Sequence, residues 1–232
     1  MRTLAVLSRK GGTGKTTVAL HLATAAYRDG RSTILSDMDP QRSALDWRRE
    51  RKIAGPDVAE TKVGTLFTAR QAAVRSGVDL MVLDTRPSSD MESAEAVRFA
   101  DLCLIVVRPC YFDLKAIVRT VELVTNMNRR ALFVLNQAPI RHRGTEPKLI
   151  RETVSELERL GLPVADVGLR YRTAYQNAVR QGLSAQEAEP GSNAAVEINA
   201  LWRQVSRELW PPVIDAAVEA PLAARERVLA LG

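Results

Sequence analysis

The sequence predicts an α/β fold, a mostly parallel twisted sheet with helices on both faces. Two observations support this prediction. Short, almost continuously apolar segments that suit buried strands alternate along the chain with longer segments of helical periodicity. In addition, a glycine-rich segment joins the first apolar segment directly to the first helical one, at the sheet edge where such folds bind ligands.

Five apolar segments are predicted to be strands, and a sixth gives a weaker signal. Each is rich in Leu, Val or Ile and is short enough for a strand that is buried on both faces. Because helical segments separate them, the strands are expected to run parallel. The strong candidates are residues 4–7, 33–35, 80–83, 102–107 and 132–135, and the weaker one is 164–167.

Eight segments with helical periodicity fill the spaces between and after these strands. The last one stops at two consecutive prolines, which cannot continue a helix. We therefore expect one domain at residues 1–210 and an accessory tail at 211–232. The predicted helices are 17–28, 44–53, 66–75, 93–99, 114–127, 147–160, 174–181 and 194–210.

Length and composition are those of a globular protein. The 232 residues are 46% hydrophobic, which is enough for one full core. No charged-then-apolar leader opens the chain, and no apolar run approaches the roughly 20 residues that cross a bilayer, so we expect a cytoplasmic protein without a membrane anchor. Cys103 and Cys110 lie within and just after an apolar segment, where they suit a core better than a disulfide or a metal site.

The net charge of +6 comes mainly from arginine. Only six of the 33 basic residues are lysine. Arginine suits binding to phosphate backbones because its planar guanidinium donates two parallel hydrogen bonds. The base composition of a genome can produce the same bias, and the sequence leaves both explanations open.

The glycine-rich segment is predicted to bind phosphate. Its glycines let the backbone curl so that successive N–H groups point at phosphate oxygens, and the following helix adds its positive end. Lys15 would reach the β- and γ-phosphates, and the Thr16 hydroxyl would ligate Mg²⁺. The predicted nucleotide-binding residues here are Gly11, Gly12, Thr13, Gly14, Lys15, Thr16 and Thr17.

Lys10 is the unusual residue of this loop. The usual motif has a glycine where this chain has Arg9, and Lys10 adds a second cation next to it. One nucleotide already has Lys15 and Mg²⁺ for charge neutralisation, so a second lysine makes most sense if it serves another nucleotide. The plainer alternative is a solvated lysine.

Residues 10–17, KGGTGKTT, resemble the deviant Walker motif of the ParA/MinD ATPases. In that family the first lysine reaches across a dimer to the ATP of the partner. The resemblance implies a P-loop NTPase that binds ATP and Mg²⁺, forms an ATP-dependent homodimer and uses Lys10 and Lys15 in catalysis.

Three aspartates follow predicted strands at the same sheet edge. Asp37 and Asp39 project from one side of an extended chain, where acids can position a metal and an attacking water. Their sequence resembles the switch I of ParA-like ATPases, which implies that Asp39 organises the catalytic water and that Asp37 lies near the metal. Such a sequence is also common as a turn and helix cap. Asp84 ends the next strand as a Walker B carboxylate does and is predicted to hold Mg²⁺; Arg86 after it departs from the family's switch II.

Two further residues are predicted to contact the base. Asn136 follows a strand where related ATPases use an Asn to read adenine, although an Asn after a strand is also a common turn residue. Pro109 matches a proline that lines the base pocket in the family. The two histidines, His21 and His142, form no recognisable set for covalent catalysis.

A basic region follows the last strong strand and is predicted to bind DNA without reading bases. If its cations share a face, they neutralise phosphates and give binding that falls steeply with salt. A solvated helix with i,i+4 ion pairs is the alternative, but ParA proteins place nucleoid-binding arginines in this part of the domain. The candidates are Arg141, Arg143, Lys148, Arg170, Arg172 and Arg180.

The overall likeness covers residues 1–210 and is closest to short, ParF-like partition ATPases. It implies a cytoplasmic, nucleoid-associated switch that holds double-stranded DNA as an ATP dimer until a ParB-like or adaptor protein stimulates ATP hydrolysis, and so partitions a plasmid or chromosome. A MinD-like membrane switch is the main alternative, although the tail barely offers a basic amphipathic helix. An electron-transfer ATPase is disfavoured by the cysteine positions, and a protein assembly or transferred DNA could replace the plasmid as cargo.

Overall fold

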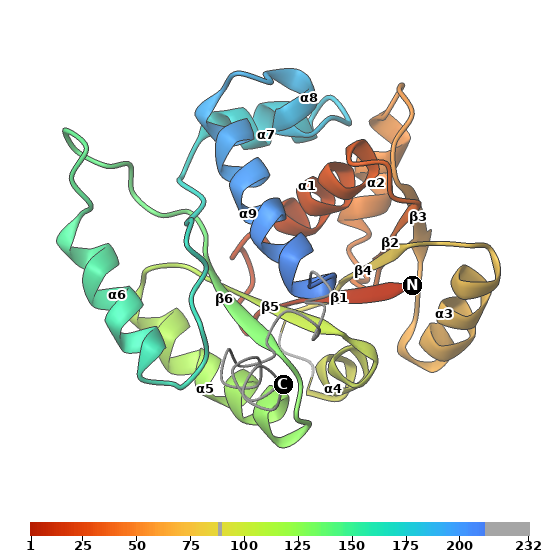
Figure 1. Ribbon diagram of the computed structural model, residues 1–232, viewed down its shortest axis with the longest axis horizontal. Helices are drawn as coiled ribbons and strands as arrows, with labels where there is room; N and C mark the ends of the chain where they lie inside the picture. The colour runs from red at the N-terminus through yellow and green to blue at the C-terminus, as the bar shows by residue number, and fades with distance from the viewer. Residues whose placement is uncertain (88–89, 212–232) are drawn as a thin grey trace, which may run out of the picture.

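The computed structural model describes residues 1–87 and 90–211, which are organised around one six-stranded parallel sheet (Figure 1). The strand order is β3-β2-β4-β1-β5-β6, so β1 lies inside the sheet and the loop that follows it is flanked by other strand ends. The strands are β1 Arg2–Leu7, β2 Thr33–Asp37, β3 Asp57–Glu60, β4 Leu80–Asp84, β5 Leu102–Val107 and β6 Ala131–Leu135.

The five strong strand predictions are confirmed within one or two residues at most ends. The weaker one, 164–167, is wrong: Val164 makes only an isolated bridge to Phe133, and Arg170 makes another to Ala138. The short strand β3 was not predicted. Its Asp-Val-Ala-Glu sequence carries two polar ends, and it lies at the sheet edge, where one neighbour is enough.

All eight predicted helices are present, with ends that differ by up to three residues. Two short elements were not predicted: a 3₁₀ turn at Val63–Thr65 and α8 Ala185–Ala188, which Ser184 and Glu187 stabilise with a capping box. The other helices are α1 Lys15–Arg28, α2 Ser43–Glu50, α3 Leu66–Arg75, α4 Asp90–Phe99, α5 Tyr111–Asn126, α6 Lys148–Glu158, α7 Thr173–Val179 and α9 Asn193–Leu209.

Alternate residues of the central strand pack on opposite sides of the sheet. Leu4 and Val6 belong to a core formed with α1, α2 and α9, whereas Ala5 and Leu7 belong to a second core formed with α3, α4, α5 and α6. Both faces are therefore covered, as the apolar strands predicted. The predicted α/β fold class is confirmed.

The described chain ends just after α9. Trp210 packs against Trp202 and lies under the guanidinium of Arg31, 3.7 Å from its carbon to the ring centre. The predicted tail, 211–232, lies outside the described residues beyond Pro211. Among the helices that are described, none is long and apolar enough to cross a membrane.

Candidate functional site

The loop between β1 and α1 has the backbone of a phosphate cradle. Gly12 and Gly14 have φ values of 73° and 85°, a left-handed conformation that side chains rarely adopt. Gly14 also lies against Asn136, so that a Cβ there would collide with the Asn136 amide nitrogen. Both glycines are therefore required by the loop itself, and α1 begins directly after them at Lys15.

Ser8 organises the inside of this loop. Its hydroxyl donates to the Lys10 carbonyl at 2.9 Å and accepts from the Thr13 hydroxyl at 2.8 Å. The Lys15 ammonium also reaches the Ser8 oxygen, at 3.3 Å. Ser8 was not identified from the sequence, because a serine after a strand has many possible roles.

The two lysines of the loop differ in exposure. Lys15 is buried, with 6% of its surface accessible; burial lowers its pKa, and Asp84 and Asp39 oppose that shift. Lys10 is exposed, and its ammonium makes no hydrogen bond or ion pair within the described part of the chain. Lys15 therefore faces the loop of its own subunit, whereas Lys10 is available to a ligand outside it.

Asp84 is a buried carboxylate next to this loop. It pairs in register with Asp37 of the neighbouring strand, and its side chain is fully buried. Burial raises the pKa of Asp84 to about 7, against opposing effects from the Thr16 hydroxyl and Lys15. Neither carboxylate oxygen makes a well-aligned hydrogen bond to another described residue.

The residues present fit a Mg²⁺ ion bound together with phosphate. The two buried carboxylate oxygens of Asp84 and the nearby Thr16 hydroxyl are hard oxygen donors of the kind that Mg²⁺ prefers. Across residues 1–87 and 90–211, no group of three or more His, Cys, Asp or Glu side chains could hold a metal by itself. Mg²⁺ commonly keeps one or two protein carboxylates and takes its other ligands from phosphate and water, and Asp84 and Thr16 would supply the protein's share.

The Asp37 carboxylate accepts hydrogen bonds from the start of α2. Its Oδ2 accepts hydrogen bonds from the N–H groups of Ala44 and Leu45 at 3.0 and 3.1 Å, and its Oδ1 accepts from the N–H of Asp39 at 3.1 Å. Asp37 thus binds the first turn of α2 from outside the helix, whose N-cap residue is Arg42, and the metal role of Asp37 stays a prediction. Asp39 is partly exposed, and its Oδ1 accepts from the N–H of Gln41 at 3.0 Å.

Two consecutive side chains at the end of β6 contact the phosphate loop. The Asn136 amide donates to the Thr13 carbonyl at 2.6 Å, and the Gln137 amide donates to the Gly12 carbonyl at 2.8 Å. Asn136 is buried, and one of the two N–H groups of its amide is used by the Thr13 carbonyl, so its reading of adenine stays a prediction. Gln137 was missed, because nothing in the sequence marks its left-handed φ of 54°.

Pro109 lies two residues after the end of β5, the strand between β1 and β6. The preceding residue, Arg108, is held by the Asp113 carboxylate with contacts of 2.8 and 3.0 Å. A Cβ on Gly12 would lie 3.9 Å from the Arg108 guanidinium, so this cation borders the loop. The base-contacting role of Pro109 stays a prediction.

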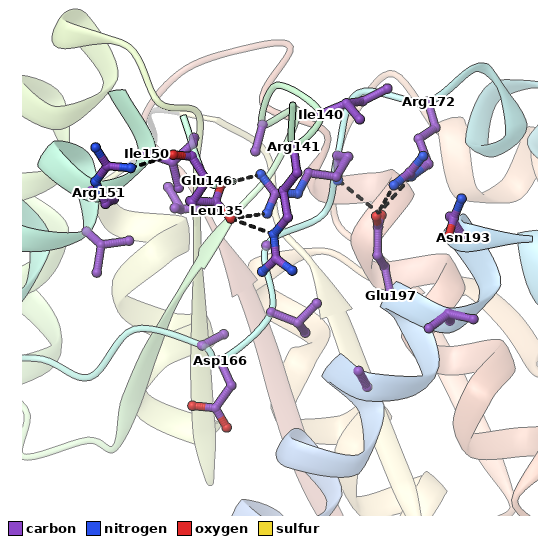
Figure 2. Close-up of a pocket in the computed structure, with 18 of the residues that line it drawn as sticks. Leu135, Ile140, Arg141, Glu146, Ile150, Arg151, Asp166, Arg172, Asn193 and Glu197 are labelled. Atoms are coloured by element: carbon purple, nitrogen blue, oxygen red, sulfur yellow. Dashed lines mark hydrogen bonds and ion pairs between the residues drawn. The ribbon is translucent and has the colours of Figure 1, made fainter. Parts of the chain in front are cut away.

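Figure 2 shows a cavity of about 610 Å³ between the loop after β6, α6 and α9, lined by three of the six predicted basic residues, Arg141, Arg170 and Arg172. Arg170 has 8% of its surface accessible and contacts Glu146 through both terminal nitrogens, at 2.6 and 2.7 Å. Arg172 contacts Glu197 at 2.9 and 2.7 Å. Internal carboxylates thus pair with both side chains, and the DNA-binding role of Arg170 and Arg172 stays a prediction.

The other four candidates are more accessible. Arg141 contacts Glu146 at 2.8 Å but keeps 60% of its side chain exposed, and Lys148 keeps 80% exposed beside Glu152. Arg143 is exposed, with no ion pair to another described residue. Arg180 follows α7, which lies apart from α6 (Figure 1), so these four cations do not form one cluster.

Comparison with known proteins identifies the family. The family model described as "CobQ/CobB/MinD/ParA nucleotide binding domain" matches residues 4–185, which include the phosphate loop, Asp84 and Asn136. The chain belongs to this family. Its ParA/MinD-type loop, recognised from the two lysines, and its P-loop NTPase fold agree with that assignment.

Several curated relatives match most of this chain. It is 34% identical over 221 residues to "Maintenance of carboxysome distribution protein A" of Halothiobacillus neapolitanus, covering 88% of this chain and 95% of that protein. It is 27% identical over 218 residues to "Protein ParA" of Rhizobium radiobacter, covering 86% and 93%.

Solved structures show the same fold. The apo McdA structure from Cyanothece superposes with a TM-score of 0.73 at 16% identity, covering 89% of this chain and 99% of that one. MinD of Pyrococcus horikoshii, solved with Mg-ADP, superposes with a TM-score of 0.70 at 16% identity, covering 89% and 96%. At these identities the likeness concerns the fold alone.

Proposed function

We propose that this chain is a Mg²⁺-dependent ATPase that works as a dimerisation switch. Two subunits enclose two ATP molecules, the dimer holds double-stranded DNA without reading its sequence, and a partner protein stimulates hydrolysis. The switch thereby positions a large cargo over the nucleoid. A nucleotide that contacts both subunits favours the dimer, and DNA that contacts both favours it further.

The contrast between Lys10 and Lys15 carries this proposal. Lys15 is buried beside Ser8 and Asp84, where it serves the phosphates of its own subunit. Lys10 is exposed at the mouth of the same loop. An exposed cation beside an already neutralised phosphate site supports contact with the triphosphate of a second subunit.

Hydrolysis is assigned to the aspartates around the loop. Asp84 and Thr16 would hold Mg²⁺, which neutralises charge on the β- and γ-phosphates when bound. Asp39, partly exposed and directed by the bond from the Gln41 N–H, would orient the attacking water. These groups position and stabilise charge, which is what phosphoryl transfer requires of a protein.

DNA binding is assigned to the accessible cations rather than to all six predicted ones. Arg141, Arg143 and Lys148 surround the loop before α6, and Arg180 lies at the end of α7. Contacts of this kind would go to phosphates, because lysine and arginine side chains pair with phosphate oxygens whatever the base sequence. Affinity should therefore fall steeply with salt.

The cargo is proposed to be a protein assembly rather than a plasmid. Two relatives whose printed name refers to carboxysome distribution each share 34% identity with this chain over 221 and 217 residues. The relative named ParA is 27% identical. The adaptor that stimulates hydrolysis would then bind a protein compartment, while the ATPase and DNA surfaces keep the family's arrangement.

A DNA-binding titration tests the proposal. Binding to double-stranded DNA should require ATP, be lost with ADP or without nucleotide, and weaken as salt rises. Liposomes of anionic lipid serve as a parallel arm, because a MinD-like membrane switch would bind them with ATP instead. Binding to DNA that is equal in all three nucleotide states would contradict the proposed switch.

A further inference from the structure

The carbonyl groups of the phosphate loop are held from one side by two amide side chains. Asn136 donates to the Thr13 carbonyl at 2.6 Å and Gln137 donates to the Gly12 carbonyl at 2.8 Å. The donors are consecutive residues, and so are the acceptors. Two matched hydrogen bonds of this kind fix the orientation of two successive peptide planes.

The orientation of a peptide plane determines where its N–H group points. In a trans peptide the C=O and the following N–H lie on opposite sides of the chain. No cis peptide occurs among the described residues. Holding the carbonyls of Gly12 and Thr13 toward β6 therefore turns the N–H groups of Thr13 and Gly14 away from β6, into the loop, where a phosphate would accept them.

The two donors directly follow β6, and backbone hydrogen bonds hold the segment on both sides of Gln137. The Asn136 N–H bonds to the Val107 carbonyl at 2.9 Å, and the Ala138 N–H bonds to the Leu169 carbonyl at 3.0 Å. The donor pair thus lies between two backbone hydrogen bonds. Gln137 takes the left-handed φ of 54° between these anchors, which directs its side chain back to the loop.

We propose that Asn136 and Gln137 are positioning residues that preorganise the phosphate loop before a ligand arrives. The inference rests on the family's nucleotide site and adds to it a role for Gln137 and an additional role for Asn136. The pair acts on the phosphate chain and not on the base. It therefore contributes equally to adenine nucleotides, to guanine nucleotides and to pyrophosphate, which has no base at all.

Gln137→Gly removes the Gln137 donor without disturbing the backbone, because glycine adopts a positive φ freely. Asn128→Gly is the matched control, since Asn128 also has a positive φ, of 50°. It lies between α5 and the start of β6, whereas the phosphate loop lies at the other ends of the strands. Affinities for ADP and pyrophosphate are measured by calorimetry, and melting temperature is measured without ligand.

Gln137→Gly should lower the affinities for ADP and for pyrophosphate by about the same factor, on the order of five- to tenfold for one lost hydrogen bond. The Asn128→Gly control should change neither affinity. Affinities equal to wild type, or a fall in the ligand-free melting temperature with unchanged affinities, would overturn the proposal. So would a loss of ADP affinity without a loss of pyrophosphate affinity.

Asn136→Ala separates positioning from base reading. Equal losses of ADP and GDP affinity support the positioning role, whereas a loss confined to ADP assigns Asn136 to the base and overturns its part of the proposal. These measurements use ligands that do not require dimerisation or DNA. If the proposed dimerisation switch were wrong, the results of these affinity measurements would not change. The positioning role and the switch can therefore be contradicted independently.

Discussion

Arg170 and Glu146 form a bidentate ion pair that joins the segment before α7 to the loop before α6. The contacts are 2.6 and 2.7 Å, and the Arg170 hydrogen bonds lower the pKa of Glu146 to about 2. Because the pKa of Glu146 is lower in the folded state, its carboxylate stabilises the fold fully at pH values above its ordinary pKa of 4.5. This stabilisation is lost as pH falls from 4.5 toward 2. The pair is therefore intact at neutral pH.

Arg170→Met should destabilise the fold at pH 7 by about 2 kcal/mol, because it leaves Glu146 partly buried without its main partner. Urea unfolding measures this loss. The same variant should keep most of its affinity for DNA at a temperature where it is folded. A large loss of DNA affinity with unchanged stability would show that Arg170 contacts DNA after all.

Arg143→Ala should have the opposite profile. Its exposed side chain has no ion pair to another described residue, so stability should change by less than about 0.5 kcal/mol. DNA affinity with ATP should fall. The plot of log affinity against log salt concentration should become less steep by about one unit, as expected for the loss of one phosphate contact. Arg119→Ala, an exposed cation on α5, is the control, and an equal effect there would point to net charge alone.

His21 predicts a pH dependence of stability. It is fully buried; its Nε2 accepts from the Ala185 N–H at 3.0 Å, so its Nδ1 carries the proton and donates to the Thr17 carbonyl at 2.7 Å. Burial lowers the pKa of His21 from 6.5 to about 4. The folded state thus favours the neutral ring, and the stability that this ring supplies is complete above pH 6.5 and is lost between pH 6.5 and 4.

The loss over that range should be about 3 kcal/mol. His21→Gln removes the titration, so the difference in unfolding free energy between wild type and variant should shrink as pH falls from 7 to 4. Taking this difference cancels groups common to both proteins, including Asp84. A difference that stays constant across the range would contradict the account.

Asp84→Asn should raise stability without nucleotide while removing the effect of Mg²⁺. Burial raises the pKa of Asp84 to about 7, above its ordinary 3.8, so the ionised form destabilises the fold increasingly from pH 3.8 to 7. At pH 8 the neutral Asn should therefore stabilise the protein, by at most ~4 kcal/mol. Melting curves at pH 8 should show this gain, and added Mg²⁺ should no longer tighten ATP binding.

Strand positions could be predicted from the sequence because buried parallel strands need continuous apolar residues. Leu102–Val107 was predicted to the residue for that reason. Residues 164–167 gave a weaker apolar signal and form only isolated bridges, since the apolar pattern reports burial and not hydrogen bonding. β3 escaped detection because an edge strand with charged ends is not fully buried.

The site could be predicted only where a local sequence determines the geometry. The glycines of the phosphate loop were recognised because their left-handed backbone excludes other residues. Ser8 was missed because a serine after a strand has many possible roles, and Gln137 was missed because its contact depends on how β6 lies relative to the loop, which no local pattern states. For Arg170 the sequence shows a charge but not the carboxylate that pairs with it.

The dimerisation role of Lys10 is tested most directly by light scattering during gel filtration with Mg-ATP, in an Asp39→Ala background that slows hydrolysis. The Asp39→Ala protein and its Lys52→Ala control should elute as dimers, since Lys52 is merely an exposed lysine. Adding Lys10→Ala should give a monomer that still binds ATP. An ATP-dependent dimer that persists without the Lys10 ammonium would contradict the account.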